Sequence, residues 1–415
     1  MTAALALYRA ATALLEPLAP VLLSRRAAKG KEDRARLGER LGRAGVARPD
    51  GPLVWLHGAS VGETLSLLPL IEWLRARRPD LAILVTSGTA TSAALLARRL
   101  PEGVIHQYAP IDAPRALARF LAHWKPGLVM LAEGEIWPNL IGAAKATGAK
   151  LALISARMTA RSTAGWARLP ATARAVFGGF DAVLAQDDAS AQRLTALGAR
   201  DDGRLNLKLA GEPLPVDAAA LAAIEAGARG RPILLAASTH DGDEALALEA
   251  FKKAALHSKA VLAIAPRHPA RTPEVGVVAT SIGWNSAYGA RPFWKDRVYI
   301  INTLGELGPW FAAARLAYIG GGLSDRIGGH NPLEAARLDC AVASGPRVGN
   351  WAGVYAALGE AVTWVETADD LAAAYRAALD EPDAVAARAA AARAVADDAA
   401  AGLEARFAPL AALLP

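Results

Sequence analysis

The sequence predicts an α/β protein built from two doubly wound parallel sheets. Three observations point to this class: short apolar runs, amphipathic helical segments between them, and a restart of the same rhythm after Gly211. Strands that alternate with helices form β-α-β units, in which the strands run parallel. The chain has 415 residues and 53% apolar residues, enough for two or three compact units with buried cores.

The apolar runs fall into two groups on either side of a junction at residues 203–231, which holds Pro213, Pro215 and several glycines. A short apolar run bounded by turn residues is typical of a buried strand. In the first half we expect strands at residues 52–57, 81–85, 104–108, 128–132, 150–155 and 182–185, with helices at 65–77, 91–99 and 113–124. In the second half we expect strands at 232–237, 260–265, 297–301, 316–320, 341–344 and 362–365. The alanine-rich tail from Leu371 is predicted to be helical, with breaks near Pro382 and Pro409.

Composition excludes several classes of protein. The single cysteine, Cys340, excludes a disulfide framework and a cysteine-based zinc or iron–sulfur cluster. Internal apolar runs stay below the length of about 18–20 residues that a membrane span needs, which excludes a polytopic transporter. The chain carries neither a Walker P-loop nor a dinucleotide fingerprint after its first strand, so ATP hydrolysis and NAD chemistry are disfavoured.

The N-terminal region joins an apolar stretch to a basic one. Residues 3–23 are mostly Ala and Leu, but Arg9, Glu16, Pro17 and Pro20 make them a poor transmembrane helix. Residues 24–43 then hold eight basic residues against three acidic ones. This combination is typical of an interfacial anchor on an anionic membrane face. The alternative is a helix packed on the protein's own core, followed by a solvated basic helix.

Two loops of the first half carry carboxylates directly after predicted strands. In His57-Gly-Ala-Ser-Val-Gly-Glu63, Ser60 and Glu63 fit a capping box, which is a structural device. A carboxylate at the end of the first strand can equally act as a general base. In the loop at residues 132–139, Glu133 and Glu135 either bind a hydroxylated ligand or fix a neighbouring loop. The residues alone leave both pairs of alternatives open.

Two loops of the second half are suited to anions. Arg267 follows a predicted strand and offers a planar fork for phosphate or carboxylate, unless it is only an exposed arginine between prolines. A glycine loop at residues 320–329 leads into a predicted helix with Asn331 at the N-cap and Glu334 at N3. Free N–H groups at a helix start attract anions, and glycines let a phosphate or ribose approach the backbone. The cleft between two such halves is the expected ligand site.

Taken together, these segments resemble the 3-deoxy-D-manno-octulosonic acid (Kdo) transferases, glycosyltransferases that add Kdo to a lipid A precursor. The matched segments lie in order over roughly residues 30–334. They include His57-Gly-Ala-Ser-Val-Gly-Glu63, Glu133-Gly-Glu-Ile-Trp-Pro-Asn139, Asn206-Leu-Lys208, Ala237-Ser-Thr-His240, Pro266-Arg-His268 and Gly328-Gly-His-Asn-Pro-Leu-Glu334. One departure is Asn302, where the family usually has aspartate.

The resemblance implies a GT-B fold, with two Rossmann-like domains facing a cleft and an N-terminal membrane-associated helix. It implies a membrane-associated segment at residues 1–45, an acceptor domain at 46–208 and a donor domain with C-terminal helices at 209–415. It further implies CMP-Kdo as donor, a lipid A precursor as acceptor, and inverting transfer without a metal or other cofactor. The expected location is the cytoplasmic face of the inner membrane, held by a peripheral or single N-terminal anchor on the anionic surface, with no nucleic-acid partner.

The same resemblance assigns residues to roles. Glu63 is the expected catalytic base. The expected donor-binding positions are Ser238, Arg267, His268, Gly305, Glu306, Gly329, Asn331 and Glu334. The acceptor-side candidates are Ser60, Gly62, Glu133, Glu135 and Lys208. Two rival interpretations stay open: a nucleotide-sugar epimerase of the same architecture, and a non-catalytic membrane-bound scaffold.

Overall fold

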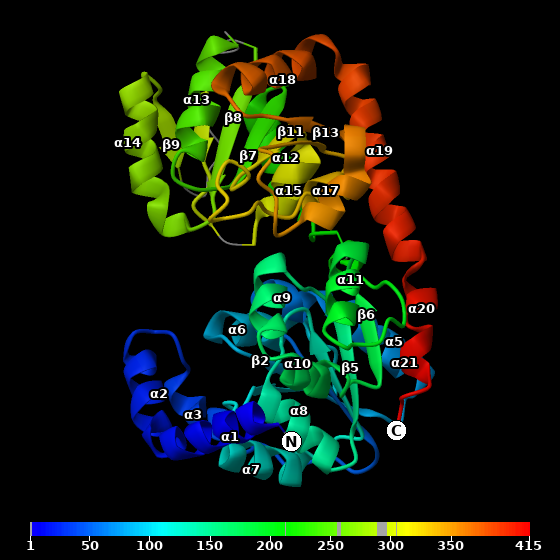
Figure 1. The fold of residues 1–415 in the computed structure, drawn as a ribbon. Coiled ribbons are helices and arrows are strands. Elements are labelled where there is room, and N and C mark those ends of the chain that lie inside the picture. The colour runs from blue at the N-terminus through cyan, green and yellow to red at the C-terminus, as the bar shows by residue number, and fades with distance from the viewer. Residues whose placement is uncertain (1, 212, 255–258, 289–296, 304) are drawn as a thin grey trace. The chain divides into compact units, whose positions relative to one another are not determined.

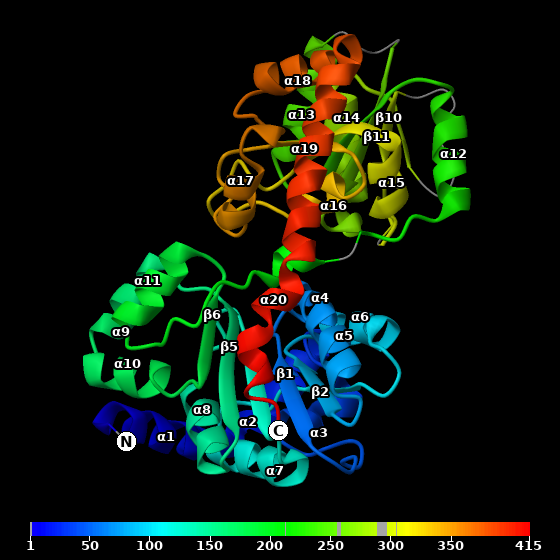
Figure 2. The ribbon, with the colours of Figure 1, turned by 90° about the vertical axis from the view of Figure 1, so that its right-hand side faces the viewer.

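The chain divides into two compact units, each built around one parallel sheet. The computed structural model describes residues 2–211, 213–254, 259–288, 297–303 and 305–415 (Figure 1). Unit 1 is Met1–Gly211 with Ala401–Pro415, and unit 2 is Glu212–Ala400. The boundary lies within the predicted junction. The predicted range of the second domain, 209–415, is wrong at its end, because Ala401–Pro415 belongs to unit 1, where Leu403, Phe407 and Leu410 are buried in the core. In Figure 2 this segment runs from helix α20, Leu403–Arg406, to the C-terminus.

Unit 1 contains six parallel strands in the order β3-β2-β1-β4-β5-β6. Helices cover both faces of this sheet, so its strands are apolar along most of their length. Every strand lies within two residues of its predicted run. The strands are β1 Leu53–His57, β2 Ala82–Ser87, β3 Ile105–Tyr108, β4 Leu128–Ala132, β5 Lys150–Ala156 and β6 Ala182–Ala185.

The helices of unit 1 follow the predicted pattern with one correction. The predicted helix at 65–77 is two helices, α4 and α5, because Pro69 lies in the first turn of α5 and cannot continue a preceding helix. The described helices are α1 Ala3–Leu15, η1 Glu16–Leu18, α2 Ala19–Ala28, η2 Arg34–Arg36, α3 Leu37–Arg40, α4 Val61–Ser66, α5 Leu68–Arg77, α6 Ala90–Arg99, α7 Pro114–Trp124, α8 Pro138–Ala146, α9 Ala160–Ala167, α10 Pro170–Phe177, α11 Asp188–Ala196, η3 Leu207–Ala210, α20 Leu403–Arg406 and α21 Ala408–Ala411.

The N-terminal helices pack on unit 1, with α1 beside α7 (Figure 1). The Tyr8 hydroxyl donates to Asp112 at 2.9 Å, and Asn139 donates to the Thr12 hydroxyl at 2.9 Å. Glu16 is buried and accepts the Arg115 backbone N–H at 3.0 Å. The stretch Ala3–Ala28 is nevertheless long and apolar enough to cross a bilayer, by length and composition alone. Its outer face exposes Leu7, Leu14, Leu15, Leu18, Val21 and Leu22.

Part of the basic segment is neutralised inside unit 1. Glu32 is buried between Arg26, at 2.9 Å, and Arg40, at 3.4 Å. Glu39 binds Arg36 at 2.7 Å and also accepts the backbone N–H of Tyr108 on the edge strand β3. Three of the eight basic residues of this segment are thus bound to carboxylates of the same segment.

In the described residues of unit 2, seven parallel strands lie in the order β13-β12-β11-β7-β8-β10-β9. The short strand β9 was not predicted, because three residues at a sheet edge give no apolar run. The strands are β7 Ile233–Thr239, β8 Val261–Pro266, β9 Ser286–Tyr288, β10 Val298–Ile300, β11 Ala314–Ile319, β12 Ala341–Ser344 and β13 Val362–Trp364. The helices are α12 Ala218–Ala228, α13 Asp243–Lys253, η4 Pro269–Arg271, α14 Thr272–Ile282, α15 Leu307–Ala313, α16 Leu333–Ala336, α17 Ala352–Leu358, η5 Gly359–Ala361, α18 Ala368–Asp380 and α19 Pro382–Ala401.

Both sheets contain a topological switch point. In unit 1 the chain builds outward from β1 to β3 and then returns to place β4 on the other side of β1, with His57 opposite Leu131. In unit 2 the equivalent neighbours are β7 and β11, with Ala237 opposite Ile319. Ligands of open α/β sheets bind beyond the carboxyl ends of the strands at such a point. The fold class is therefore confirmed, and it singles out the loops after β1, β4, β7 and β11.

Candidate functional site

Glu63 lies in the first turn of α4, just after β1. Its side chain folds back on the loop, where Oε2 accepts the Ala59 N–H at 2.7 Å and Oε1 accepts the Ser60 hydroxyl at 2.8 Å. The Ser60 oxygen in turn accepts the Glu63 N–H at 3.3 Å, so Ser60 is the N-cap of α4. Ser60 therefore caps α4 as predicted, but the return bond of a capping box goes to Ala59, one residue before the cap, and these bonds hold the carboxylate in one place.

Electrostatics make Glu63 a stronger base than an ordinary carboxylate. Burial raises the pKa of its carboxyl, and the negative charge of Glu133 raises it further. Hydrogen bonds from Ser60 and Ala59 lower that pKa without cancelling the rise, and Glu135 adds a smaller repulsion. A raised pKa brings a carboxylate closer to the range in which it accepts protons efficiently near neutral pH.

The loop after β4 supplies the two neighbouring carboxylates. Glu133 forms a nearly buried ion pair with Lys208, with Nζ and Oε1 2.8 Å apart. Lys208 lies in η3, which packs against α4. Glu135 accepts from the Trp137 indole at 2.6 Å and lies 3.3 Å from Nε2 of His57. Four acceptor-side candidates therefore act on Glu63. Ser60 donates to its carboxylate, the charges of Glu133 and Glu135 raise its pKa, and Lys208 binds Glu133.

Backbone strain occurs at the same strand ends. Glu133 has a φ of 54°, Ser155 at the end of β5 has a φ of 50°, and Ser238 at the end of β7 has a φ of 55°. Residues other than glycine rarely adopt this left-handed conformation, which costs roughly 1–3 kcal/mol and is often found at functional sites. The positive φ values are a second, independent indication that the functional site lies at the carboxyl ends of the strands.

Asp243 organises the switch point of unit 2. It is buried in the first turn of α13, where Oδ1 accepts the Tyr318 hydroxyl at 2.9 Å. Its Oδ2 accepts the N–H groups of His240 at 2.9 Å and of Gly321 at 2.8 Å. One carboxylate thus ties the loop after β7, which carries the expected donor residue Ser238, to the glycine loop after β11.

A histidine pair joins the same two loops. The Nε2 atoms of His240 and His330 are 2.8 Å apart, and the rings stack with 5.1 Å between their centroids. The ring of His268 lies edge-on to His240 at 6.2 Å. Burial lowers the pKa of His330 to about 4, and the charge of Arg267 contributes, so His330 is neutral near pH 7.

Arg267 and Glu334 complete this cluster. Arg267 is exposed, and its backbone N–H donates to Thr239 at 3.0 Å. Burial raises the pKa of the Glu334 carboxyl, while the charge of Arg267 opposes that rise. The structure thus brings the donor candidates Arg267 and His268 close to the histidine pair and Glu334 close to Arg267, with a cationic group open to an anionic ligand.

The glycine loop differs from its predicted role. A Cβ on Gly320 would lie 2.7 Å from the Ser238 carbonyl oxygen, and one on Gly322 would lie 2.7 Å from that of Gly345. These glycines let protein loops pack together. The predicted helix is a single turn, Leu333–Ala336, which begins later than expected. Asn331 lies just before it and accepts the Leu333 N–H at 3.0 Å.

The remaining candidates lie near these loops with fewer contacts. Gly329, with a φ of 76°, packs on Val348. Gly305 and Glu306 follow β10 at the same edge of the sheet, where Glu306 accepts the Thr303 hydroxyl, and no contact joins them to the histidine pair among the described residues. Gly62 has open space where a side chain would be and no positive φ, so the turn itself does not require glycine there.

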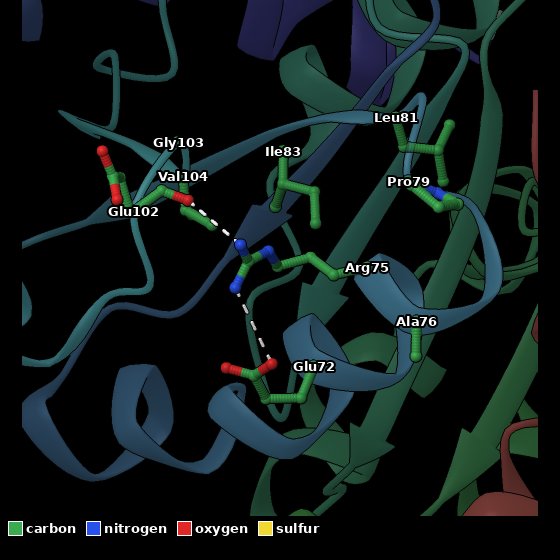
Figure 3. A pocket seen from close by; sticks show the side chains of 9 residues that line it. All are labelled: Glu72, Arg75, Ala76, Pro79, Leu81, Ile83, Glu102, Gly103 and Val104. Carbon is green, nitrogen blue, oxygen red and sulfur yellow. Dashed lines mark hydrogen bonds and ion pairs between the residues drawn. The ribbon is translucent and has the colours of Figure 1, made fainter.

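A surface cavity of about 490 Å³ lies at the other end of the strands (Figure 3). It is lined by residues at the amino ends of β2 and β3, including Ile83 and Val104. Arg75 points across it, 3.8 Å from Glu72 and 3.3 Å from the Glu102 carbonyl oxygen. Because ligands of such sheets bind at the carboxyl ends, this cavity is not the candidate site.

Residues 35–210 match the family model of 3-deoxy-D-manno-octulosonic-acid transferase. A probable mitochondrial Kdo transferase of Arabidopsis thaliana is 31% identical over 91% of this chain and 88% of its own length. The Bordetella pertussis enzyme is 37% identical over 75% of this chain and 76% of its own. The chain belongs to the Kdo transferase family. The resemblance drawn from the sequence is confirmed, and the chain is a glycosyltransferase by family.

Solved structures support the GT-B fold. Anabaena HepE, in complex with UDP and glucose, aligns with a TM-score of 0.59 at 14% identity and covers 87% of this chain and 100% of HepE. The UDP-GlcNAc 2-epimerase of Neisseria meningitidis aligns with a TM-score of 0.56 at 11% identity, over 84% of this chain and 98% of its own. Because a 2-epimerase also has this architecture, the fold alone does not separate transferases from epimerases, and sequence similarity is what assigns the family.

Sequence reasoning missed His57, Asp243 and His330 as members of these clusters. Asp243 had one detectable signal, an acidic residue in the first turn of a helix that follows a strand. The His240–His330 contact joins residues ninety positions apart, and only the pairing of β7 with β11 brings them together.

The Asp243 linkage leads to a prediction about unit 2. Asp243→Asn replaces one acceptor oxygen with a donor, so a buried N–H or hydroxyl loses its partner. We expect the free energy of unfolding of unit 2 to fall by about 1–3 kcal/mol. Hydrogen exchange of the β7 and β11 amides measures this unit separately. The matched control is the exposed Asp241→Asn, for which we expect a change within about 0.5 kcal/mol. Equal protection in the two variants would contradict the linkage.

Proposed function

We propose that this protein is an inverting, metal-independent glycosyltransferase that moves Kdo from CMP-Kdo to a hydroxyl of a lipid A precursor. The observation that carries the proposal is Glu63, a fixed carboxylate of raised pKa at the switch point of unit 1. Membership of the Kdo transferase family supports the transferred sugar. The charged and strained loops after β7 and β11 support a donor site in unit 2.

The mechanism follows from what each group can do. Glu63 accepts the proton of the acceptor hydroxyl as its oxygen attacks the anomeric carbon of Kdo. The bond from that carbon to the phosphate oxygen breaks in the same displacement, which inverts the configuration, and CMP leaves with the electron pair. Arg267 stabilises the negative charge on the departing phosphate. Lys208 holds Glu133 beside Glu63, and Glu133 in turn keeps the Glu63 pKa high.

The membrane is the second element of the proposal. We infer that α1 and α2 lie on an anionic bilayer surface, where the acceptor lipid is found. The outward face is strongly apolar, with Leu14 80% exposed. Glu16 is the only acidic residue among the first 31, and it is buried against Arg115 and Arg119. The exposed face therefore offers leucines and cationic groups without a carboxylate, which is the chemistry that suits anionic lipids.

The first functional prediction concerns the base. Glu63→Gln keeps the shape of the side chain and most of its hydrogen bonding, but removes the proton acceptor. We expect Kdo transfer to fall at least ~10²-fold, the usual scale for a general base, with CMP-Kdo binding retained. If Glu63 were only a cap, transfer would stay near normal and the cost would be at most ~1 kcal/mol of stability.

The pH profile provides a second check on Glu63. The carboxylate is the active form, so kcat/KM falls as the pH drops through a pKa that lies above the usual glutamate value. Ser60→Ala removes a hydrogen bond that lowers this pKa, and should move the acid limb of the profile to higher pH. An acid limb at the same pH in both proteins would argue against Glu63 as the titrating group.

The next prediction concerns the donor. Arg267→Ala removes a charge-assisted contact, and we expect CMP-Kdo binding measured by calorimetry to weaken about 10–100-fold. Arg267→Lys should recover only part of the affinity, because an ammonium group lacks the planar fork. Arg376→Ala, an exposed arginine of α18, serves as control. EDTA should leave transfer unchanged, and a strict requirement for a divalent ion would contradict the proposed role of Arg267.

The last prediction of this group concerns the lipid surface. Arg25, Lys29 and Lys31 are exposed and lack an ion partner among the described residues. Replacing all three with Gln should weaken binding to vesicles containing anionic lipid, by roughly 1 kcal/mol for each residue near the surface. High salt should have a similar effect on the parent protein. Transfer to a lipid-embedded acceptor should fall more than transfer to a detergent-solubilised one.

A matched control removes the same charge elsewhere. Arg98, Arg99 and Lys125 are exposed residues of unit 1 outside the N-terminal helices. Replacing these three with Gln should leave vesicle binding close to that of the parent. If both triple variants lose the same amount, the effect is one of net charge, and the N-terminal surface is not specific for the membrane.

A further inference from the structure

Trp137 is an exposed tryptophan at the candidate acceptor site. It follows β4, immediately before α8, and 41% of its surface is accessible. Its indole N–H donates to Glu135 Oε2 at 2.6 Å. A large apolar ring whose polar atom is already satisfied presents a flat surface to solvent at a fixed orientation.

The residues behind Trp137 hold it in place. Glu135 lies 3.3 Å from Nε2 of His57, and His57 is buried with Nδ1 2.9 Å from the Thr86 hydroxyl. Burial raises the pKa of the Glu135 carboxyl, but the hydrogen bonds from His57 and Trp137 outweigh this, and the net pKa is lowered. Glu135 is therefore a carboxylate that accepts from both rings, and binding on Trp137 would not have to order a free side chain.

The loop that carries Trp137 connects the base to the apolar N-terminal helix. At one end Glu133 and Glu135 act on the charge of Glu63. At the other end Asn139 donates to Thr12 in the last turn of α1, at 2.9 Å. Trp137 lies between these two points in the loop. A ligand with an apolar part at α1 and a reacting hydroxyl at Glu63 would pass this ring.

We propose that Trp137 is a sugar-binding platform on which a pyranose ring of the acceptor stacks while one of its hydroxyls reaches Glu63. The inference rests on the proposed function and adds a subsite to it. One face of a pyranose ring consists mainly of C–H groups and packs on an aromatic ring, while the hydroxyls at its edge remain free for polar groups. Glu135, which is bonded to the Trp137 indole, is a polar group beside such an edge.

The test compares three variants in steady-state kinetics. Trp137→Ala removes the platform, Trp137→Phe keeps an aromatic surface, and Trp364→Ala removes a tryptophan of similar exposure, 44%, from β13 of unit 2. The acceptors are a detergent-solubilised lipid A precursor and its deacylated sugar headgroup. We expect Trp137→Ala to raise the KM of both acceptors about tenfold, the scale of one lost ring stack. The KM for CMP-Kdo should stay within about twofold, and Trp137→Phe should recover most of the loss.

Direct binding separates this inference from the proposed function. Calorimetric titration of the deacylated headgroup into the parent and into Trp137→Ala requires no turnover, so it reports on Trp137 even if the assigned donor is wrong. Unchanged headgroup affinity in Trp137→Ala would overturn the platform. A loss of vesicle binding with an unchanged headgroup KM would also overturn it, because Trp137 would then contact lipid. Absence of Kdo transfer by the parent, with headgroup binding that depends on Trp137, would refute the proposed reaction and leave the subsite standing.

Discussion

The positions of Glu63, of its neighbouring carboxylates and of the contact between His240 and His330 depend on one topological constraint, the reversal of strand order in each parallel sheet. Parallel strands need long crossovers, and the crossover from β3 to β4 passes back across the sheet to pair with β1. The loops that follow β1 and β4 then leave the carboxyl edge of the sheet in opposite directions. A crevice forms between such loops, and this crevice is where open α/β sheets bind ligands. Unit 2 repeats this with β7 and β11. Residues far apart in sequence therefore share one edge in each unit.

The same contacts at Glu63 serve structure and chemistry. A capping carboxylate is normally a fully solvated group at a helix start, whose bonds lower its pKa. Here burial and two neighbouring carboxylates outweigh those bonds, so the pKa of the Glu63 carboxyl is raised, which suits it to the base role that we propose. The two interpretations that the sequence left open are thus compatible: the hydrogen bonds fix where Glu63 is, and the charges of Glu133 and Glu135 raise its pKa.

Local pattern predicts the elements of this chain well where burial is complete. The strands β4, β6 and β12 have the predicted bounds, because runs such as Leu128–Ala132 are apolar on both faces. Local sequence patterns did not predict the contacts that depend on packing between residues far apart in the chain. Nothing local shows that Phe407 returns to unit 1, that Gly320 packs on Ser238, or that Asp243 bonds to Gly321. The site residues could be predicted from their residue type and from the family resemblance. The residues that contact them could be identified only from the folded structure.

The loop of residues 133–139 connects several parts of unit 1 that are far apart in the sequence. Three of its residues contact different parts of unit 1: Glu133 binds Lys208 of η3, Glu135 lies beside His57 of β1, and Asn139 donates to Thr12 of α1. Ile136 packs against the hydrophobic core of unit 1 and so anchors the loop on the sheet. Because these anchors are fixed by the sheet and by α1, the distance from Glu63 to the apolar helix is set by the fold of unit 1 itself. The amphipathic acceptor that we propose would need such a fixed distance between the surface proposed to hold its apolar part and the carboxylate proposed to accept its proton.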